Sequence, residues 1–385
     1  MAALLFAQEF TPVKYSTRFG VLTAGSLVLW GVGCYPVRAD ELSAEFRQSV
    51  TKGLDWLVKM QQRDGHWEGN GGQYQGAMTA LSGMALLMEG STIRDGKYAA
   101  NVRKAVDWMM THSQNNGLLG NSNRANERER YMYGHGFGLL FLACVYGEEE
   151  DSERRTKLED ILNRGVQFTG KAQTSRGGWG YVANGCNVEG DDLDEGSVTI
   201  TQAQALRAAR NAGISVPGSI IDKAIGYLKK STGPGGGIIY SLGMGRRDER
   251  AALTAAAIAC GFSLGEYQSP MVKGWIKSCQ NTIRTLGVGS GRIGHDEYTH
   301  YYYAQVLYML GEDGYAKLFP ESNEHDRLTW SKYRKTTFAA LVKLQSSDGS
   351  WNSSATWGYV GPIYTTALSL SILQLDKATL PIYQR

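Results

Sequence analysis

The chain has 385 residues, of which 42% are hydrophobic and 20% charged, and its formal net charge is +3 at pH 7. This length suits a sizeable buried core. The near balance of 40 basic and 37 acidic residues, without a basic run, excludes a strongly basic nucleic-acid-binding protein, so we expect no nucleic-acid partner.

The first 39 residues are predicted to lie outside the fold. Lys14 and Arg18 precede a short apolar run at 21–34, and Ala39 ends the segment, which is typical of a secretory signal. The run is too short for a comfortable membrane span, and an uncleaved N-terminal anchor is the alternative. We therefore expect residues 40–385 to form one domain of an exported protein (periplasmic, secreted or envelope-associated). Contact with a membrane would come only through an uncleaved N-terminal segment.

The rest of the chain repeats a pair of helical segments. The first member of each pair is amphipathic, which is typical of a helix with one wet face, and the second is apolar or small all round, which predicts complete burial. The predicted pairs are 44–62 with 76–88, 98–113 with 133–146, 157–173 with 197–212, 220–230 with 250–262, 270–285 with 298–310, and 328–345 with 364–375. The second helices recur about every 50 to 65 residues, in keeping with helix-hairpin repeats.

Six buried helices inside six half-wet ones predict an all-α fold, an (α/α)6 toroid. All inner helices then run in one direction, so their N-termini and the loops before them meet at one end of the ring. We expect any functional site at that end.

One of these loops carries a cluster of acidic residues directly before a predicted inner helix. The acids are Asp191, Asp192, Asp194 and Glu195. Acids at a helix start are favoured by the helix dipole alone, which is the structural explanation. The alternative is that they line the mouth of a cavity as catalytic groups.

Further residues at the loop end are candidates for the mouth of such a cavity. They are His135, Asp248, Arg250, Asp296, His300, Tyr298, Tyr302 and Tyr364. For His135, between two glycines, a structural role is favoured over a catalytic one. The cysteines Cys144, Cys186, Cys260 and Cys279 match no metal-binding spacing, and their pairing stays open.

Three of the links between paired helices share a signature. The residues are Gln61, Gly65 and Trp67, then Gln173, Gly178 and Trp179, then Gln345, Gly349 and Trp351. This pattern resembles the QW repeat (prenyltransferase and squalene oxidase repeat) of terpenoid cyclases and protein prenyltransferases, and the likeness covers about residues 44–382, with degraded second, fourth and fifth copies. The chain resembles most the exported single-toroid members. The indole is expected to cap the outer helix and the glutamine to bond exposed backbone groups, so these residues indicate stability and not catalysis.

The resemblance implies a chemistry for the acidic cluster. Squalene-type cyclases protonate an alkene with the middle acid of a DxDD motif, and residues 192–195 read DxDE, which places Asp194 as the proton donor. Aromatic faces would stabilise the cations formed. Three features depart from the pattern: Glu195 replaces the last Asp, Gly196 intervenes before the helix, and the chain is one toroid where the triterpene enzymes have two.

Two other branches of the resemblance imply sites that the residues do not support. Protein prenyltransferases bind zinc through a cysteine thiolate, but this chain has Arg250 at the corresponding position. Only Asp248, His295 and His300 remain there as potential ligands, so we predict no metal and no cofactor. Cys186 begins a stretch similar to the thioester GCGEQ of complement-type domains but lacks its glutamine, and is expected to be inert.

The leading hypothesis is an exported toroid that binds an apolar, isoprenoid-like ligand in its central cavity; if it is an enzyme, Asp194 is the acid of cyclase-type chemistry. One alternative is a non-catalytic scaffold that presents its loop end to a protein partner. Another is a carbohydrate-active (α/α)6 glycosidase or lyase with paired carboxylates among Asp191, Asp194, Asp248 and Asp296. A deep apolar funnel favours the first hypothesis, a filled ring the second, and an open groove with facing carboxylates the third.

Overall fold

Two concentric layers of helices make up the part of the chain that the structure describes. This computed structural model describes residues 43–121, 127, 129–183, 192–286, 296–352 and 360–383. Residues 42–385 belong to one compact unit. The predicted signal, 1–39, lies outside the described residues, so cleavage and export stay predictions.

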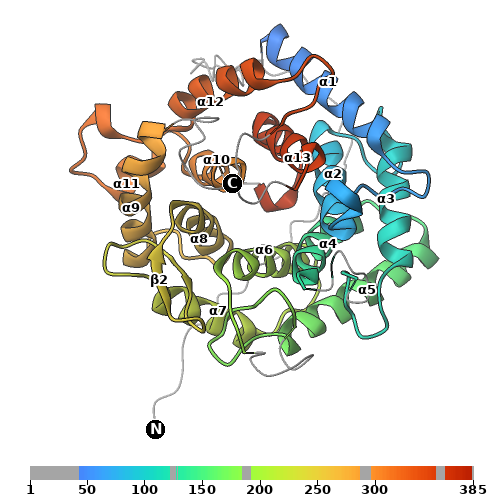
Figure 1. The fold of residues 1–385 in the computed structure, drawn as a ribbon, viewed down its shortest axis with the longest axis horizontal. Coiled ribbons are helices and arrows are strands. Elements are labelled where there is room, and N and C mark those ends of the chain that lie inside the picture. Colours follow the sequence, from blue (N-terminus) through green and yellow to red (C-terminus); the bar gives the residue numbers. More distant parts are fainter. Residues whose placement is uncertain are drawn as a thin grey trace, which may run out of the picture. The chain divides into compact units, whose positions relative to one another are not determined.

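The inner helices form a closed ring in which each contacts the next and the last contacts the first (Figure 1). They are α2 (Gln75–Glu89), α4 (Tyr131–Tyr146), α6 (Gly196–Asn211), α8 (Ala251–Ser263), α10 (Asp296–Leu310) and α13 (Pro362–Leu373). Around them lie α1 (Ala44–Met60), α3 (Ala99–Thr111), α5 (Ser152–Lys171), α7 (Gly218–Lys230), α9 (Pro270–Leu286) and α12 (Trp330–Leu344). The predicted (α/α)6 toroid is confirmed.

The burial of each layer follows from its sequence pattern. Every residue of α2 from Gln75 to Met88 is buried, whereas α1 buries one side, through residues such as Val50, Leu54 and Leu57. Shorter elements join the layers. They are η1 (Asn70–Gly72), α11 (Gly314–Leu318), η2 (Glu324–Asp326), η3 (Leu375–Lys377) and η4 (Pro381–Tyr383). Among the described residues, no helix combines the length and apolar character needed to cross a membrane.

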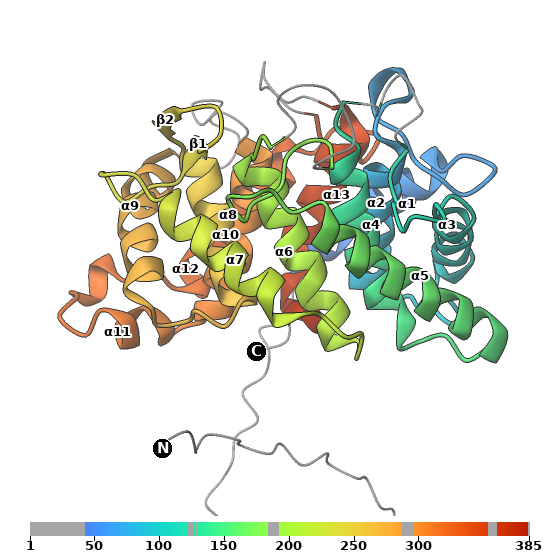
Figure 2. The same ribbon diagram turned by 90° about the horizontal axis from the view of Figure 1, so that it is seen from below.

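A small hairpin before α8 was not predicted. Strands β1 (Ile239–Ser241) and β2 (Arg246–Glu249) pair antiparallel and project at the loop end of the ring (Figure 2). Its base is held by Glu249, whose carboxylate accepts the backbone N–H groups of Gly235 (2.7 Å) and Gly237 (2.8 Å). The sequence pattern did not indicate strands because such short strands depend on contacts with the glycine-rich link rather than on an apolar period.

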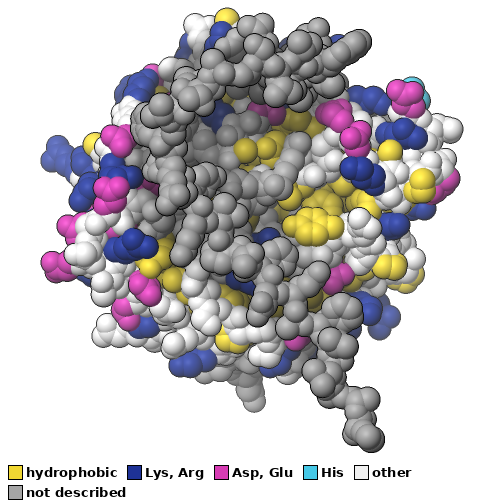
Figure 3. Space-filling view, turned by 180° about the vertical axis from the view of Figure 1, so that it is seen from behind, with side chains coloured by type: hydrophobic (Ala, Val, Ile, Leu, Met, Phe, Trp, Pro, Cys, Tyr) yellow, Lys and Arg dark blue, Asp and Glu magenta, His cyan; other side chains and the backbone are white. Residues whose placement is uncertain are grey.

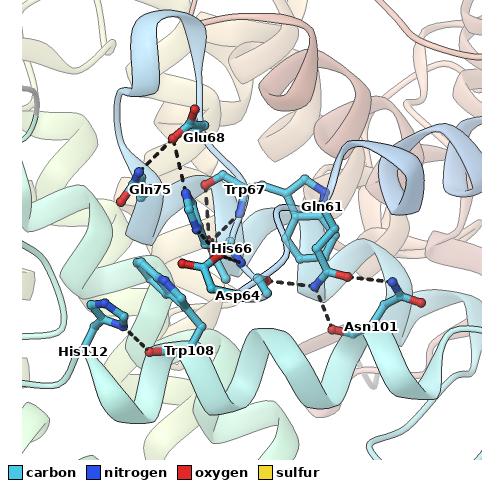
Figure 4. A network of polar contacts seen from close by, with 11 residues as sticks. Gln61, Asp64, His66, Trp67, Glu68, Gln75, Asn101, Trp108 and His112 are labelled. Carbon is cyan, nitrogen blue, oxygen red and sulfur yellow. Dashed lines mark hydrogen bonds and ion pairs between the residues drawn. The ribbon is translucent and has the colours of Figure 1, made fainter.

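The three tryptophan-bearing links share one geometry, and the first is drawn in Figure 4. The indole N–H groups of Trp67, Trp179 and Trp351 donate to the carbonyls of Leu57 (2.7 Å), Thr169 (2.8 Å) and Leu341 (2.7 Å) at the ends of the outer helices. The side-chain amides of Gln61, Gln173 and Gln345 each donate to the link and to the neighbouring outer helix. The expected structural bonds of both residue types are therefore present.

A glycine in the link holds each repeat against the next. Gly65, Gly117, Gly177 and Gly349 have φ of 105°, 95°, 94° and 99°, a region that suits glycine. A Cβ on Gly65 or Gly349 would lie 2.4 or 2.5 Å from the carbonyl oxygen of Lys104 or Lys52. Because Lys52 belongs to the first repeat and Gly349 to the last, this approach closes the ring.

The end of the ring opposite the loops is closed by the C-terminal segment. The hydroxyls of Tyr301 on α10 and Tyr383 in η4 lie 3.2 Å apart. A cavity of about 40 Å³ remains beside η4, which holds no more than a few waters. Figure 3 looks at this end, where hydrophobic side chains gather around a hollow near the ring axis.

A buried polar contact lies inside the ring as well. Gln204 on α6 donates from Nε2 to Oε1 of Gln305 on α10 at 2.9 Å, and these two helices are separated in the inner ring by α8. Both glutamines are buried. Side chains of two inner helices that are not neighbours thus meet inside the ring.

Candidate functional site

A set of tyrosines marks the loop end of the ring. Each of the six described repeats contributes one. Four lie in the first turn of an inner helix or just before it, one lies in the link before α6, and one lies on strand β1 before α8. The six are Tyr74, Tyr133, Tyr181, Tyr240, Tyr298 and Tyr364, and all are partly buried against the core. We call these six residues the tyrosine collar.

Contacts between collar members show that they share one region. The rings of Tyr133 and Tyr181 lie 5.9 Å apart, and the hydroxyls of Tyr181 and Tyr240 are hydrogen-bonded. Burial raises the pKa of Tyr133 and of Tyr298 well above the usual phenol value, with further increases from Glu195 and from neighbouring tyrosines. These phenols therefore stay protonated and serve as hydrogen-bond donors and aromatic faces.

Three arginines lie over rings of the collar, among them Arg246, whose guanidinium carbon lies 5.1 Å from the ring centre of Tyr240. The guanidinium carbon of Arg130 lies 4.8 Å from the ring centre of Tyr181, and that of Arg250 lies 4.2 Å from the ring centre of Tyr240. Arg250 also donates to the exposed Asp248 at 2.8 Å. These arginines thus place positive charge next to the aromatic rings of the collar, in positions that favour cation–π contact.

Backbone strain is present at the collar. Tyr74, immediately before α2, has φ 52° and ψ 42°, the left-handed region that a bulky residue rarely adopts. Such strain costs on the order of 1–3 kcal/mol and clusters at binding and active sites.

Glu195 lies beneath the collar and caps α6. Its Oε2 accepts hydrogen bonds from the Ser197 hydroxyl and from the Val198 N–H (3.0 Å), and the side chain is buried. The Ser197 hydroxyl lies 2.6 Å from the hydroxyl of Tyr133. Desolvation raises the pKa of Glu195, and the hydrogen bonds from Ser197 and Val198 oppose this increase without cancelling it.

Asp194 is also buried, but its carboxylate binds the hairpin. Oδ1 accepts from the Tyr227 hydroxyl (2.9 Å) and the Leu242 N–H (2.8 Å), and Oδ2 accepts from the Gly243 N–H (2.9 Å). Burial and the Asp194 carboxylate raise the pKa of Tyr227, which keeps this phenol a donor. Asp194 therefore joins α7, the loop before α6 and the β1–β2 turn.

The other acids of the cluster differ from these two. Asp192 is partly exposed and accepts from Ser175 N–H (2.7 Å) and from Arg176 Nη1 (3.0 Å). Desolvation is the largest single effect and raises the pKa of Asp192, but the hydrogen bonds from Ser175 and the charge of Arg176 together outweigh it and lower that pKa. Asp191 lies outside the described residues, so its predicted role is untested.

The surroundings of His135 are those of a packed side chain. Nδ1 accepts the Leu119 N–H (3.3 Å), so Nε2 carries the proton and donates to Thr169 Oγ1 (2.8 Å). Burial lowers the pKa of His135 to about 3, so the ring is neutral. In the tryptophan-bearing links, the backbone N–H of the tryptophan donates to a threonine hydroxyl (Thr79, Thr199 or Thr366). In the second repeat Leu119 stands at the position of the tryptophan, and His135 stands at the position of the threonine.

The residues considered for a metal lie in separate environments. Asp296 and His300 are buried and face each other at 3.4 Å on α10, and His300 Nδ1 lies 2.9 Å from the Tyr333 hydroxyl. Asp248 is exposed and pairs with Arg246 and Arg250. No cluster of three or more potential ligands occurs among the described residues, and His295 lies outside them. The prediction that the protein holds no metal therefore stays a prediction.

The remaining predicted residues belong to the core. Tyr302 is fully buried and packs edge-to-face on Tyr298 (4.8 Å between ring centres) and Tyr301 (4.9 Å). Cys144, Cys260 and Cys279 are free thiols, and burial raises the pKa of Cys144 to about 12. Cys186 lies outside the described residues.

Sequence reasoning did not single out Tyr74, Tyr240, Arg130 or the Ser197 link to Tyr133. A partial signal for the collar was present: aligning the repeats on their inner helices places a tyrosine near the start of α2, α4, α10 and α13, but not of α6 and α8. The stacking of Arg130 on Tyr181 had no such signal, because it joins residues of different repeats.

Comparison with known proteins is consistent with this architecture. No family model matches the chain. A stretch of 93 residues is 32% identical to lanosterol synthase of Homo sapiens and 30% identical to that of Mus musculus, and it spans 24% of this chain but only 13% of those proteins.

Similar solved structures share the ring. An α-1,6-mannanase of Salegentibacter sp. in complex with α-1,6-mannotriose has a TM-score of 0.59 and 9% identity, over 87% of this chain and 99% of that one. The type II terpene cyclase MstE of Scytonema in complex with its substrate, geranylgeranyl dihydroxybenzoate, has a TM-score of 0.53 and 14% identity, over 87% and 98%. At such identities the likeness shows the fold alone. The local match to lanosterol synthase, together with this ring fold, supports a place for the chain in the terpenoid cyclase-like superfamily.

Proposed function

We propose that this chain is an exported ring protein that binds an apolar, isoprenoid-like ligand at its loop end, with acid-catalysed chemistry of the cyclase type. The observation that carries the proposal is the tyrosine collar above a buried carboxyl group. Aromatic faces suit both the tail of such a ligand and any carbocation formed from it. Because Gln204 and Gln305 meet inside the ring, we place the ligand at the collar.

The test is a binding titration with geranylgeranyl dihydroxybenzoate, and α-1,6-mannotriose as the carbohydrate probe. We expect the isoprenoid to bind and the oligosaccharide not to bind. Tyr298→Leu, in the collar, is expected to weaken isoprenoid binding about fivefold, since one aromatic contact contributes on the order of 1 kcal/mol. Tyr146→Leu, at the far end of α4, is the matched control and should leave the affinity unchanged.

A scaffold function is the second candidate, and the buried contact between Gln204 and Gln305 inside the ring favours it. Binding of neither probe, together with a protein captured specifically by the loop end and lost on Tyr298→Leu, supports the scaffold. Binding of mannotriose alone overturns the isoprenoid proposal in favour of carbohydrate chemistry.

A further inference from the structure

The two buried acids before α6 differ in what their oxygens contact. Both oxygens of Asp194 accept hydrogen bonds, and two of its three donors are backbone N–H groups, which cannot reverse direction. A proton on either oxygen would face one of these N–H donors. Both acids are buried, so the difference between them is that neither oxygen of Asp194 is left without a donor.

Glu195 has the opposite arrangement. The Ser197 hydroxyl and the Val198 N–H both point at Oε2, and the Ser197 backbone N–H is a further, weaker influence on this carboxyl group. Among the described residues no hydrogen bond ends on Oε1. Some polar atoms of the protein are completely buried and have no partner, but Oε1 is not one of them. In a neutral carboxyl group the carbonyl oxygen accepts hydrogen bonds and the other oxygen carries the proton. This pattern assigns the carbonyl to Oε2 and the O–H to Oε1.

Resting on the proposed function, we propose that Glu195, and not Asp194, is the catalytic residue that transfers a proton to the bound ligand, and that Asp194 is a positioning residue. In the step, the Oε1–H bond breaks while the π electrons of a ligand alkene form a new C–H bond. A carbocation and the Glu195 carboxylate result. Loss of a proton from the carbocation to water and return of a proton from water to Glu195 complete an isomerisation with no other reactant.

The surroundings of Glu195 suit both states of this step. When the carboxylate forms, the Ser197 hydroxyl, the Val198 N–H and the N-terminus of α6 stabilise its negative charge. The Ser197 hydroxyl donates to Glu195, so the Tyr133 hydroxyl donates to Ser197 in turn. The phenols of Tyr133 and Tyr181 lie close enough to interact electrostatically with Glu195, so aromatic faces lie near the place where the cation would form.

Asp194 contributes by holding the hairpin beside the collar. It binds the β1–β2 turn through Leu242 and Gly243, and Tyr240 on β1 reaches the collar through its contact with Tyr181. Loss of Asp194 therefore moves a collar residue without removing the proton.

The test uses diazo esters, which react with neutral carboxyl groups. The carboxyl proton moves to the diazo carbon, dinitrogen leaves, and the carboxylate oxygen forms an ester. The full-length protein is treated near neutral pH with methyl diazoacetate or with farnesyl diazoacetate, and the ester is mapped by peptide mass spectrometry. We expect the ester on Glu195 with both reagents. Glu195→Gln should abolish it, whereas Asp194→Asn should retain it; Tyr227→Phe, which removes one donor to Asp194, replaces that variant where it does not fold.

An ester on Asp194, or on neither acid, overturns the assignment. An ester on Glu195 with the methyl reagent but not with the farnesyl reagent supports the neutral carboxyl and overturns isoprenoid binding, so the two proposals fail separately. As a second readout, deuterium transfer from D2O into geranylgeranyl dihydroxybenzoate should fall at least about 100-fold in Glu195→Gln and be partly restored by Glu195→Asp. A larger loss of deuterium transfer in Asp194→Asn than in Glu195→Gln would mean that Asp194 is the proton donor.

Discussion

The hydroxyl of Tyr133 on α4 lies 2.6 Å from Oγ of Ser197 on α6. This contact joins two repeats and continues to the Glu195 carboxyl group. A residue of one inner helix thereby influences the acid that caps the next. The pH dependence of stability should report on this buried acid directly.

Glu195→Gln should remove a loss of stability that the wild-type protein shows as pH rises. The folded-state pKa of Glu195 is raised above 4.5, so the unfolded chain ionises first. Its contribution to stability is therefore complete below pH 4.5 and falls by about 1.4 kcal/mol per pH unit up to the folded-state pKa. Urea unfolding between pH 4 and 8 checks this, with the exposed Glu153→Gln as control. Parallel curves for wild type and Glu195→Gln would contradict it.

Asp194→Asn should destabilise the fold by about 2–3 kcal/mol, since an amide group would face the N–H of Gly243 and leave a buried donor unsatisfied. Asp248→Asn, an exposed acid of the same hairpin, should change stability by less than about 1 kcal/mol. Urea unfolding gives both values. Faster hydrogen exchange of the Leu242 and Gly243 amides in Asp194→Asn alone would localise the effect; equal destabilisation by the two substitutions would argue against it.

Gly349→Ala should destabilise the protein by about 2–4 kcal/mol, from a left-handed backbone and from contact with the Lys52 carbonyl. Gly213→Ala is the matched control: its φ is 87°, but no atom lies within 4 Å of the added carbon. That substitution should show the backbone cost alone, about 1 kcal/mol. Thermal unfolding of both variants separates the two effects, and similar losses would mean that the ring closure tolerates the extra carbon.

Asp64→Asn should weaken the fold at neutral pH and have little effect in acid. Asp64 lies 2.6 Å from Nδ1 of His66, whose ring stacks on Trp108 at 5.2 Å (Figure 4). Desolvation opposes the shift, but the hydrogen bond and charge of His66 outweigh it and lower the pKa of Asp64 below 3.8. Its contribution is thus present above pH 3.8 and lost as pH falls through the folded-state pKa.

The Asp64 side chain is 57% exposed, although that of His66 is only 12% exposed, so we expect a difference of at most about 1 kcal/mol at pH 7. Urea unfolding of wild type, Asp64→Asn, His66→Gln and the double variant gives the coupling energy at each pH. A coupling that stays the same from pH 7 to pH 3 would contradict the ion pair.

The sequence by itself determined the ring, because the features that build it are local. Helical periodicity separated wet from buried helices, and each tryptophan link bonds within about ten residues, as Trp67 does with Leu57. The same pattern placed every inner-helix start, and hence the candidate site, at one end.

Only the tertiary structure decided what each acid of the cluster contacts. Asp194 and Glu195 are adjacent and chemically alike, yet the donors that surround Asp194 come from Tyr227 and Leu242, 33 and 48 residues away. The hairpin that carries Leu242 is too short to appear in an apolar period. Because the protonation of a carboxyl group depends on burial and on the donors that reach its oxygens, sequence spacing located the cluster while packing separated the roles of its members.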